Sequence, residues 1–594
     1  MRLHTRATRF QDSALRLIIL ALAGSFVLLP TPAASQKTAT YQTHSTSELR
    51  DLVEVYSTDR DALLRRWNVA FSSARRDRMR SFYEQWQHDL QSLDYEGLST
   101  EGRIDATLLK NCIRSELELL LRELTLRKDM DDLVPFADTV IELQEARHRF
   151  ESVDAGSAAT RLAGIPAVIE QMRTRLSDPS AAGMPSRIVA LRTANWLQQL
   201  VEELENWYEH YAEFDPTFTW WTKQPARQSS ESIREYADFL RKEVVGFTED
   251  EDPPIVGDPI GADGLGADLQ HEMIPYGAAE LVEIANLEYA WCEREMRVAS
   301  NELGYGDDWK AALEHVKTLH VAPGAQPELV RQLAHEAVDF LRKNDLLTIP
   351  PLAEEVWRMT MLSPERQKVA PFFLGGEVVQ VSYPTSEMAH ADKLMSMRGN
   401  NIHFSRAVVH HELIPGHHLQ GFMTSRYNTH RRAFRTPFWT EGWALYWEMI
   451  LWDKDFPQSA EDRVGMLFWR MHRAARIIFS LRFHLGTMTP QEAIDFLVDE
   501  VGHERASATA EVRRSFNGTY SPLYQAAYML GGLQIRALHK ELVGSGRMSN
   551  RAFHDAILQG GTMPIEMVRA RLLSTAPPRD FQANWRFYGN TLDN

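Results

Sequence analysis

Residues 409–420 read VHHELIPGHHLQ, which places four histidines and one glutamate within nine residues. Neutral imidazoles are good zinc ligands, and a carboxylate beside them can take a proton from a metal-bound water. The common arrangement is H-E-x-x-H on one helix, with both histidines on the same face. Here Pro415 occupies the fifth position, where it cannot bind a metal. The stretch therefore predicts a metal site of altered spacing, and the competing interpretation is a surface histidine cluster at a helix end.

Two histidines, His417 and His418, compete for the place of second ligand beside His411. On an unbroken helix His418 lies within about 20° of the face of His411, whereas His417 is about 120° away. However, Pro415 cannot donate the backbone hydrogen bond to the carbonyl of His411, and the glycine after it adds backbone freedom. We expect a bulge or kink that absorbs these two residues. The prediction is therefore His417 as ligand, with His418 packed beside the site and His410 in the outer shell or on the surface.

A second informative stretch lies downstream, where residues 439–448 read WTEGWALYWE. Its two carboxylates, Glu441 and Glu448, are seven residues apart and share a helix face within about 20°. Carboxylates on an aromatic helix are costly unless they meet cations, hydrogen-bond donors or a metal. We interpret Glu441 as a metal ligand. We interpret Glu448 as an outer-shell residue that hydrogen-bonds to one of the metal ligands. The alternative for Glu448 is an ordinary salt bridge.

Four stretches together resemble the bacterial family known as "domain of unknown function 885". The family pattern is H-E-x-x-P-G-H-H-x-Q, then E-G-W-A-x-Y, then R-x-x-R, then a tyrosine-containing helix ahead of glycine. The corresponding positions here are His411 to Gln420, Glu441 to Tyr446, Arg473 to Arg476, and Gln525 to Gly531. The resemblance spans about residues 40–590. Two departures are Ser480 and Arg482, where the family usually has Asp and Gly, and a longer spacing from Arg514 to Pro522.

This family is similar in turn to helical zinc peptidases that use two histidines and a downstream glutamate, such as the carboxypeptidase Taq and oligopeptidase types. The resemblance implies that His411, His417 and Glu441 bind Zn²⁺ and that Glu412 is the general base. It also implies that Tyr528 donates its hydroxyl to the developing oxyanion. We expect a zinc-dependent hydrolase that cleaves peptide substrates. The alternatives are a zinc hydrolase of non-peptide amides or esters, and a catalytically inactive peptidase-like binding protein.

The rest of the chain predicts a mainly α-helical, bowl-like architecture with a central cleft and a small β element. Helical periodicity dominates residues 36–247, and residues 267–594 form the predicted catalytic helical region, which we expect to be one integrated unit with the first. Between them, residues 248–266 are acidic and rich in Pro and Gly, as in a loop. A β-branched run at 377–383, bounded by Gly and Pro, predicts a strand that lines the cleft.

Composition excludes several other classes of protein. The formal net charge of -16 makes nucleic acid a poor partner. The chain has two cysteines, Cys112 and Cys292, so a thiolate zinc site is not expected. These cysteines could pair in an exported protein or remain buried free thiols. The sequence does not predict an oligomeric state.

Residues 1–35 are predicted to be a signal peptide. Four arginines precede an uncharged, mostly apolar run from Leu17 to Leu29, and Ala33-Ala34-Ser35 offers small residues for cleavage. The run is too short for a comfortable membrane span. We therefore expect a periplasmic or secreted protein without stable membrane association after cleavage. The alternative is an uncleaved N-terminal anchor helix.

Cleavage at this site predicts a mature chain that begins near Ser35 or Gln36. N-terminal sequencing of protein recovered from the periplasm or medium measures this directly. An intact Met1 on protein recovered from the cytoplasm would contradict export.

Overall fold

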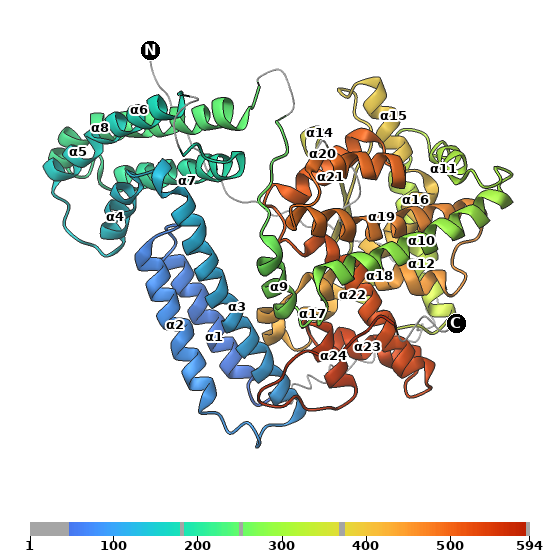
Figure 1. Ribbon diagram of the computed structural model, residues 1–594. Coiled ribbons are helices and arrows are strands. Elements are labelled where there is room, and N and C mark those ends of the chain that lie inside the picture. The colour runs from blue at the N-terminus through green and yellow to red at the C-terminus, as the bar shows by residue number, and fades with distance from the viewer. Residues whose placement is uncertain (1–46, 179–182, 249–252, 368–374, 590–594) are drawn as a thin grey trace, which may run out of the picture. The chain divides into compact units, whose positions relative to one another are not determined.

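The computed structural model describes residues 47–178, 183–248, 253–367 and 375–589 of the chain. Within these residues the structure is mostly helical, with two short strands (Figure 1). The predicted mainly α-helical fold is confirmed. The predicted signal peptide, 1–35, lies outside the described residues.

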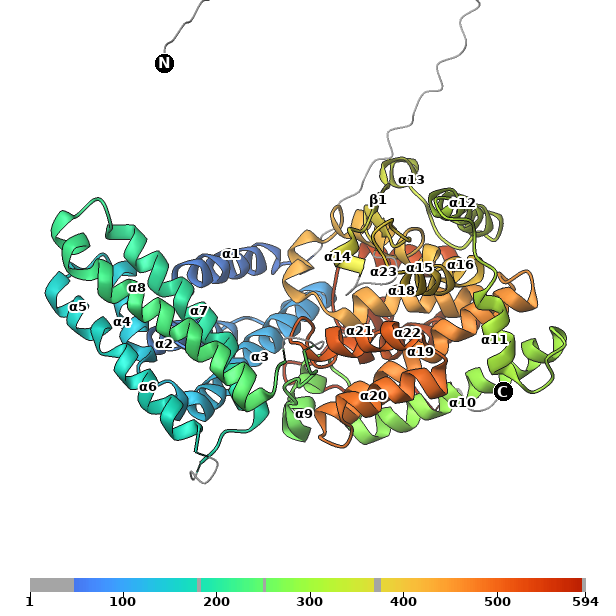
Figure 2. The same ribbon diagram turned by 90° about the horizontal axis from the view of Figure 1, so that it is seen from above.

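The first eight helices occupy the region predicted to be helical at 36–247. They are α1 (Arg50–Arg66), α2 (Ser73–Gln91), α3 (Thr100–Met130), α4 (Ala137–His148), α5 (Ala155–Ala163), α6 (Ile165–Leu176), α7 (Arg187–Tyr211) and α8 (Pro216–Phe239), with a 3-10 turn at Asp131–Leu133 and a π turn at Leu240–Val245. Helices α4 to α8 pack side by side around a core of their own (Figure 2). The buried face of α7 follows the spacing of three and four residues that its sequence predicts, from Leu197 to Trp207.

The predicted loop at 248–266 needs a correction, because its last part is helical. Residues 253–260 have no helix, but α9 (Gly261–His271) begins within the predicted loop. Its glycines are poor helix formers, and the prediction followed that preference. Leu265 and Leu269 are nevertheless buried, and this packing outweighs the local preference.

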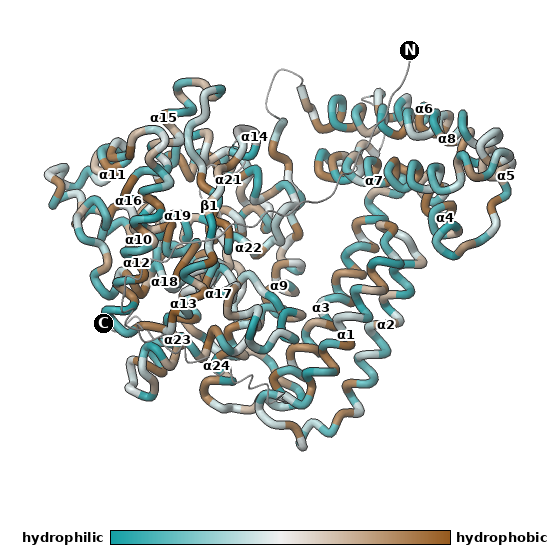
Figure 3. Tube along the Cα trace, turned by 180° about the vertical axis from the view of Figure 1, so that it is seen from behind, coloured by the Kyte–Doolittle hydropathy of each residue, from teal (hydrophilic) through white to brown (hydrophobic). Residues whose placement is uncertain are grey.

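Helices also dominate the region predicted at 267–594. They are α10 (Ala278–Glu302), α11 (Trp309–Lys317), α12 (Gln326–Lys343), α13 (Pro351–Val356), α14 (Pro364–Gln367), α15 (His390–Gly399), α16 (Ile402–Glu412), α17 (His417–Thr424), α18 (Pro437–Trp452), α19 (Ala460–His484), α20 (Pro490–Phe496), α21 (Arg505–Phe516), α22 (Tyr524–His539), α23 (Asn550–Gln559) and α24 (Ile565–Leu572). A 3-10 turn spans Thr429–Phe434, and π turns span Leu497–Val501 and Lys540–Gly544. Hydrophobic segments lie along α18 and α19, which are buried over most of their length (Figure 3).

The predicted strand is present as β2 (Val378–Val381), and it pairs in parallel with β1 (Arg358–Met361). Arg358 lies opposite Val378 in this two-stranded sheet. Val379 and Val381 are buried and alternate with less buried neighbours, as a strand with one covered face requires. The sequence did not predict β1, so the partner of this strand is a finding of the structure.

Two glycines let α18 and α22 approach each other at backbone contact. A Cβ atom added to Gly442 of α18 would lie 2.6 Å from the backbone of Gly531 in α22. A Cβ added to Gly531 would collide with the backbone of Phe438. Larger residues would therefore push the helices apart, since backbone atoms cannot move aside as a flexible side chain can. The crossing fixes how the residues before and after these glycines face each other.

A buried ionic cluster joins α3 to the turn at Thr429–Phe434. Asp105 accepts hydrogen bonds from Nε of Arg431 and Nε2 of His430, both at 2.7 Å, and all three side chains are buried. Arg431 also donates to Glu101 at 2.5 Å and to the carbonyl of Gly560 at 2.7 Å. Burial alone would raise the pKa of Asp105, but Arg431 and His430 outweigh it and lower that pKa. Removal of Arg431 would leave this buried carboxylate without its guanidinium partner.

We expect Arg431→Met to lower the free energy of unfolding by about 3–5 kcal/mol, because a buried charge loses its partner. Urea unfolding followed by circular dichroism measures the change. The exposed pair of Arg331 and Glu328 supplies the control, and Arg331→Met should change the free energy of unfolding far less, because solvent screens this pair. Equal losses in the two variants would contradict the stabilising role of the cluster.

The lowered pKa of Asp105 also predicts a pH dependence. Its contribution to stability is present above the unfolded-state pKa of about 3.9 and is lost as pH falls through the lower folded-state pKa. Arg431→Met should therefore destabilise less at low pH than at neutral pH. A loss independent of pH would contradict this assignment.

Candidate metal centre

The first metal-site motif occupies two helices rather than one bulged helix. Helix α16 begins at Asn401, whose side chain accepts from the backbone NH groups of His403 and Phe404, and it ends at Glu412. A link from Leu413 to Gly416, with a cis Ile414–Pro415 bond, connects it to α17. A Cβ on Gly416 would collide with the carbonyl of His411. The predicted disruption is thus a complete break, and the direction of the chain changes between the two histidines.

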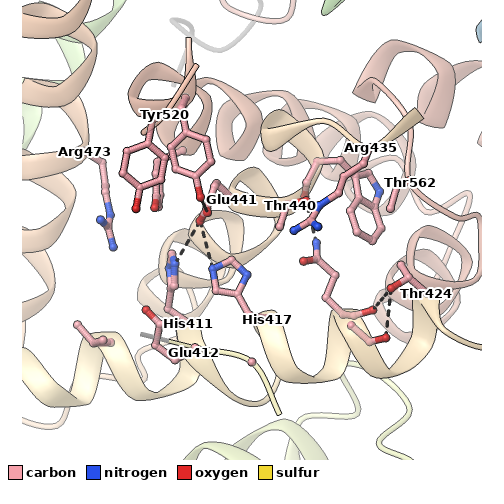
Figure 4. Close-up of a pocket in the computed structure, with 18 of the residues that line it drawn as sticks. His411, Glu412, His417, Thr424, Arg435, Thr440, Glu441, Arg473, Tyr520 and Thr562 are labelled. Carbon is pink, nitrogen blue, oxygen red and sulfur yellow. Dashed lines mark hydrogen bonds and ion pairs between the residues drawn. The ribbon is translucent and has the colours of Figure 1, made fainter. Parts of the chain in front are cut away.

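His411, His417 and Glu441 converge at one point (Figure 4). Nε2 of His417 lies 3.1 Å from Oε2 of Glu441, and Nε2 of His411 lies 3.8 Å from the same oxygen. Ligands of a tetrahedral zinc ion lie about 3.3 Å apart, since each is about 2.0–2.2 Å from the metal. His411 and Glu441 are buried, and His417 is partly exposed toward the pocket. The three side chains can therefore hold a divalent cation after small adjustments.

The other histidines of the motif point elsewhere. Nε2 of His418 donates to the carbonyl of Ala353 at 2.6 Å. Nδ1 of His410 donates to the carbonyl of Arg406 at 2.9 Å, and its ring packs edge-on against Phe456. Burial lowers the pKa of His410 to about 4, so this ring is neutral. The structure thus brings His417, and not His418, to His411 and Glu441.

Glu448 hydrogen-bonds to His411 through the ring nitrogen that does not face Glu441, as its position on the helix face predicted. Nδ1 of His411 donates to Oε1 of Glu448 at 2.6 Å, and Nη2 of Arg473 donates to the same oxygen at 3.3 Å. A proton on Nδ1 leaves the lone pair on Nε2, which is the nitrogen that faces Glu441. Carboxylate–histidine pairs of this kind orient the ring and raise its basicity as a ligand.

The carboxylates and imidazoles of the centre shift each other's pKa. Burial would raise the pKa of Glu441, but His417 and His411 outweigh it and hold that pKa well below its usual value. For His411, burial acts to lower the pKa, but hydrogen bonds with Glu441 and Glu448 raise it to about 9. Each group thus stabilises the charged form of the other. A cation bound to Nε2 of His411 would replace the proton there and stabilise the carboxylate in its place.

Glu412 stands beside this group with its carboxylate in the pocket. Its carboxylate has no hydrogen-bond partner among the described residues, and burial raises its pKa. A Cβ on Gly375 would overlap Oε2 of Glu412, so only glycine leaves space for this carboxylate. The backbone NH of Gly376 donates to the carbonyl of Glu412 at 3.4 Å. A carboxylate that is near the metal position but bound to none of its ligands suits proton transfer.

Two tyrosines of α22 lie at the ligand group, and one of them is Tyr528, the residue predicted to donate to the oxyanion. Tyr524 donates its hydroxyl to Oε1 of Glu441, which leaves Oε2 for the metal position. Tyr528, the predicted residue, stacks on the ring of His411 with centroids 6.1 Å apart, and it lines the pocket. Its hydroxyl makes no hydrogen bond with the described residues. The two tyrosines lie one helical turn apart on α22 and therefore share a face. The sequence pattern of a tyrosine-containing helix ahead of glycine is met by both of them.

These side chains line a pocket of about 730 Å³. The loop residues Gly375 and Gly376 form part of its lining, but no residue of β2 does. The prediction that the strand at 377–383 lines the cleft is therefore wrong, because the chain reaches the pocket just before the strand begins. Sequence reasoning also assigned no role to Arg476, Arg514 and Glu511, although the first belongs to the R-x-x-R motif.

The cysteine alternatives are also decided by the structure. Cys112 and Cys292 are buried free thiols. Burial raises the pKa of the Cys292 thiol to about 12, so this group is protonated and a weak metal ligand.

Comparisons with known proteins place the chain among uncharacterised relatives. Residues 56–572 match the family described as "Bacterial protein of unknown function (DUF885)". No curated protein shows significant similarity to the chain. Among the helices that the structure describes, none combines the length and apolar character needed to cross a membrane.

Two solved structures share the fold. A "putative lipoprotein of unknown function" from Shewanella oneidensis superposes with a TM-score of 0.65 at 18% identity, covering 89% of this chain and 100% of that one. A "putative lipoprotein" from Colwellia psychrerythraea gives a TM-score of 0.56 at 14% identity, covering 89% and 99%. At these identities the likeness concerns the fold alone.

The geometry of the centre predicts that substitutions of two adjacent histidines differ in their effect on metal content. His417→Ala should reduce bound zinc to a small fraction of one equivalent, whereas His418→Ala should retain it, because His418 bonds to Ala353 instead. Atomic absorption on the purified variants measures the metal, and circular dichroism checks that both fold. Loss of metal only in the His418 variant would contradict the assignment.

Proposed function

The chain belongs to the DUF885 family of bacterial proteins, and we propose that it is a zinc-dependent hydrolase of peptide bonds. One observation carries the proposal: His411, His417 and Glu441 converge at one point while the carboxylate of Glu412 enters the same pocket. The motifs of these residues resemble those of helical zinc peptidases with two histidines and a downstream glutamate, which supports the same conclusion.

The donor set fits zinc. Two imidazole nitrogens and one carboxylate oxygen are a common catalytic zinc set that leaves a position for water. Calcium and magnesium prefer oxygen ligands, so the two histidines argue against them. The hydrogen bond from His411 to Glu448 supplies the outer support that zinc-binding histidines usually have.

Zinc held there would lower the pKa of a bound water to about 7 and polarise the substrate carbonyl. Glu412 would take the proton from that water and pass it to the nitrogen of the leaving amine. The C–N bond breaks, a C–O bond forms, and the products are a carboxylate and a free amine. Tyr528 lines the pocket and its hydroxyl would donate to the oxyanion, whereas Tyr524 would hold Glu441 in place.

We also propose that the protein acts in the periplasm or outside the cell. The predicted signal peptide at 1–35 supports this, and so do the two structural neighbours described as lipoproteins. The cysteines of this chain are at 112 and 292, far from the predicted cleavage site, so a lipid anchor at the mature N-terminus is not part of the proposal. Substrates would accordingly be extracytoplasmic peptides.

Metal removal is the first test of the proposal. The purified protein should hold about one zinc per chain and should lose hydrolysis of a peptide library, followed by mass spectrometry, after chelation. Addition of zinc should restore the activity. Full activity after verified removal of all metal would contradict the proposal.

Two glutamate variants separate the proposed roles. Glu412→Gln should keep its zinc but lose at least about 100-fold in kcat, because a general base is removed while the ligands remain. Glu441→Gln should instead lose zinc affinity, because an amide oxygen is a weaker ligand than a carboxylate. The exposed Glu328→Gln is the matched control and should change neither property. Equal loss of zinc in both site variants would show that the division of roles is wrong.

A further inference from the structure

The pocket beside the metal group contains an excess of positive side chains, although the chain as a whole has a net charge of -16. Five arginines line it, against Glu412 and Glu441. The arginines are Arg432, Arg435, Arg473, Arg476 and Arg514. Guanidinium groups gathered in a partly enclosed space repel each other unless anions lie among them. The charge of the lining therefore indicates an anionic ligand.

Three of these arginines form one wall, and among the described residues two carboxylates hold them in place. Oε1 of Glu511 accepts from Nε of Arg476 at 2.7 Å, and Oε2 of Glu511 lies 2.9 Å from Nε of Arg514. Glu448 accepts from Arg473 at 3.3 Å, but it also accepts from the imidazole of His411 at 2.6 Å. Three guanidinium groups thus share two carboxylates, and this wall carries an uncompensated positive charge.

Two buried donors on this wall have no partner among the described residues. They are Nη1 of Arg476 and Nε of Arg473, and both side chains are more than nine-tenths buried. A buried charged donor without an acceptor is unfavourable, and a bound anion would supply the missing acceptor. Arginine forks match the planar geometry of a carboxylate in particular. Arg514 is partly exposed to the pocket and gives a ligand access to the wall.

The position of the wall relative to the metal group determines which carboxylate it can bind. The ring of Tyr528 stacks on His411, and the guanidinium carbons of Arg473 and Arg476 lie 4.8 and 4.5 Å from the centroid of that ring. The wall is thus separated from a proposed metal ligand by one aromatic ring. One residue of extended chain spans about 3.6 Å, and a charge-assisted hydrogen bond adds about 2.8 Å. A carboxylate on the residue directly after the scissile bond is therefore the one that would reach across a single ring.

We propose, on the basis of the proposed hydrolase function, that Arg473, Arg476 and Arg514 bind the free α-carboxylate of the substrate's last residue. The enzyme then removes single residues from the carboxyl end of peptides. Hydrolysis adds one water across the C–N bond and yields a shortened peptide and an amino acid. Arg435 lies on the other side of the metal group in Figure 4 and would face the amino-terminal part of the substrate.

Binding to an inactive variant tests this proposal without turnover. The full-length Glu412→Gln protein is titrated by calorimetry with an N-acetylated tripeptide that ends in a free carboxylate, and with the same peptide ending in an amide. We expect the acid to bind at least about 10-fold more tightly, since its carboxylate can form hydrogen-bonded ion pairs with the arginines and the amide cannot. Equal affinity for acid and amide would overturn the proposal.

Single-residue variants then test whether the preference for the free carboxylate depends on the wall formed by Arg473, Arg476 and Arg514. Arg514→Gln and Arg476→Gln, made in the Glu412→Gln background, should reduce the preference for the acid to about 2-fold or less, whereas Arg435→Gln should retain it. Arg514 is the less buried of the two, and circular dichroism with zinc content checks the fold of each variant. A preference lost in the Arg435 variant and kept in the other two would overturn the assignment.

The test also separates this inference from the proposed function. The arginines belong to the protein, so a preference for the acid should persist in metal-free protein even if the protein hydrolyses no peptide. Confirmed zinc-dependent hydrolysis without any preference for a free carboxylate would leave the function intact and overturn the inference.

Discussion

The close contact between α18 and α22 at Gly442 and Gly531 is the constraint on which the centre depends. With no side chain between the two backbones, the residue before Gly442 faces the first turn of α22. That residue is Glu441, and Tyr524 of α22 donates its hydroxyl to it. A helix pair spaced by larger side chains would separate this carboxylate from the tyrosine that orients it. The glycines of both motifs therefore determine the position of the proposed ligand Glu441 through the contact between the two helices.

The same helix, α18, approaches His411 with two carboxylates. Glu441 lies near Nε2 of the ring, and Glu448, two turns later, accepts from Nδ1. The imidazole is thus held along one helix face, and its tautomer is determined by the protein. The break at Pro415 then brings His417 to the position that completes the group. Helical spacing on α18 and interrupted spacing between α16 and α17 together produce a set of three ligands.

Much of the centre could be predicted because its determinants are local. The seven-residue spacing of Glu441 and Glu448 predicted one shared face, and Pro415 with Gly416 predicted the disruption that favours His417 over His418. Other features depend on contacts between distant segments, which local patterns do not contain. The pairing of β2 with β1, the choice between Tyr524 and Tyr528, and the arginine wall that Glu511 orders are of this kind. Helix α9 was missed because burial of its leucines outweighed its glycines.

We expect a zinc ion to bind between α16, α17 and α18 when the protein is loaded with zinc. X-ray diffraction from zinc-loaded crystals, recorded on both sides of the zinc absorption edge, locates such an ion. One anomalous peak should lie within about 2.0–2.2 Å of Nε2 of His411, Nε2 of His417 and a carboxylate oxygen of Glu441. The carboxylate of Glu412 should lie outside that ligand sphere. A peak at His410 or His418 with none between these three residues would show that zinc does not bind at this centre.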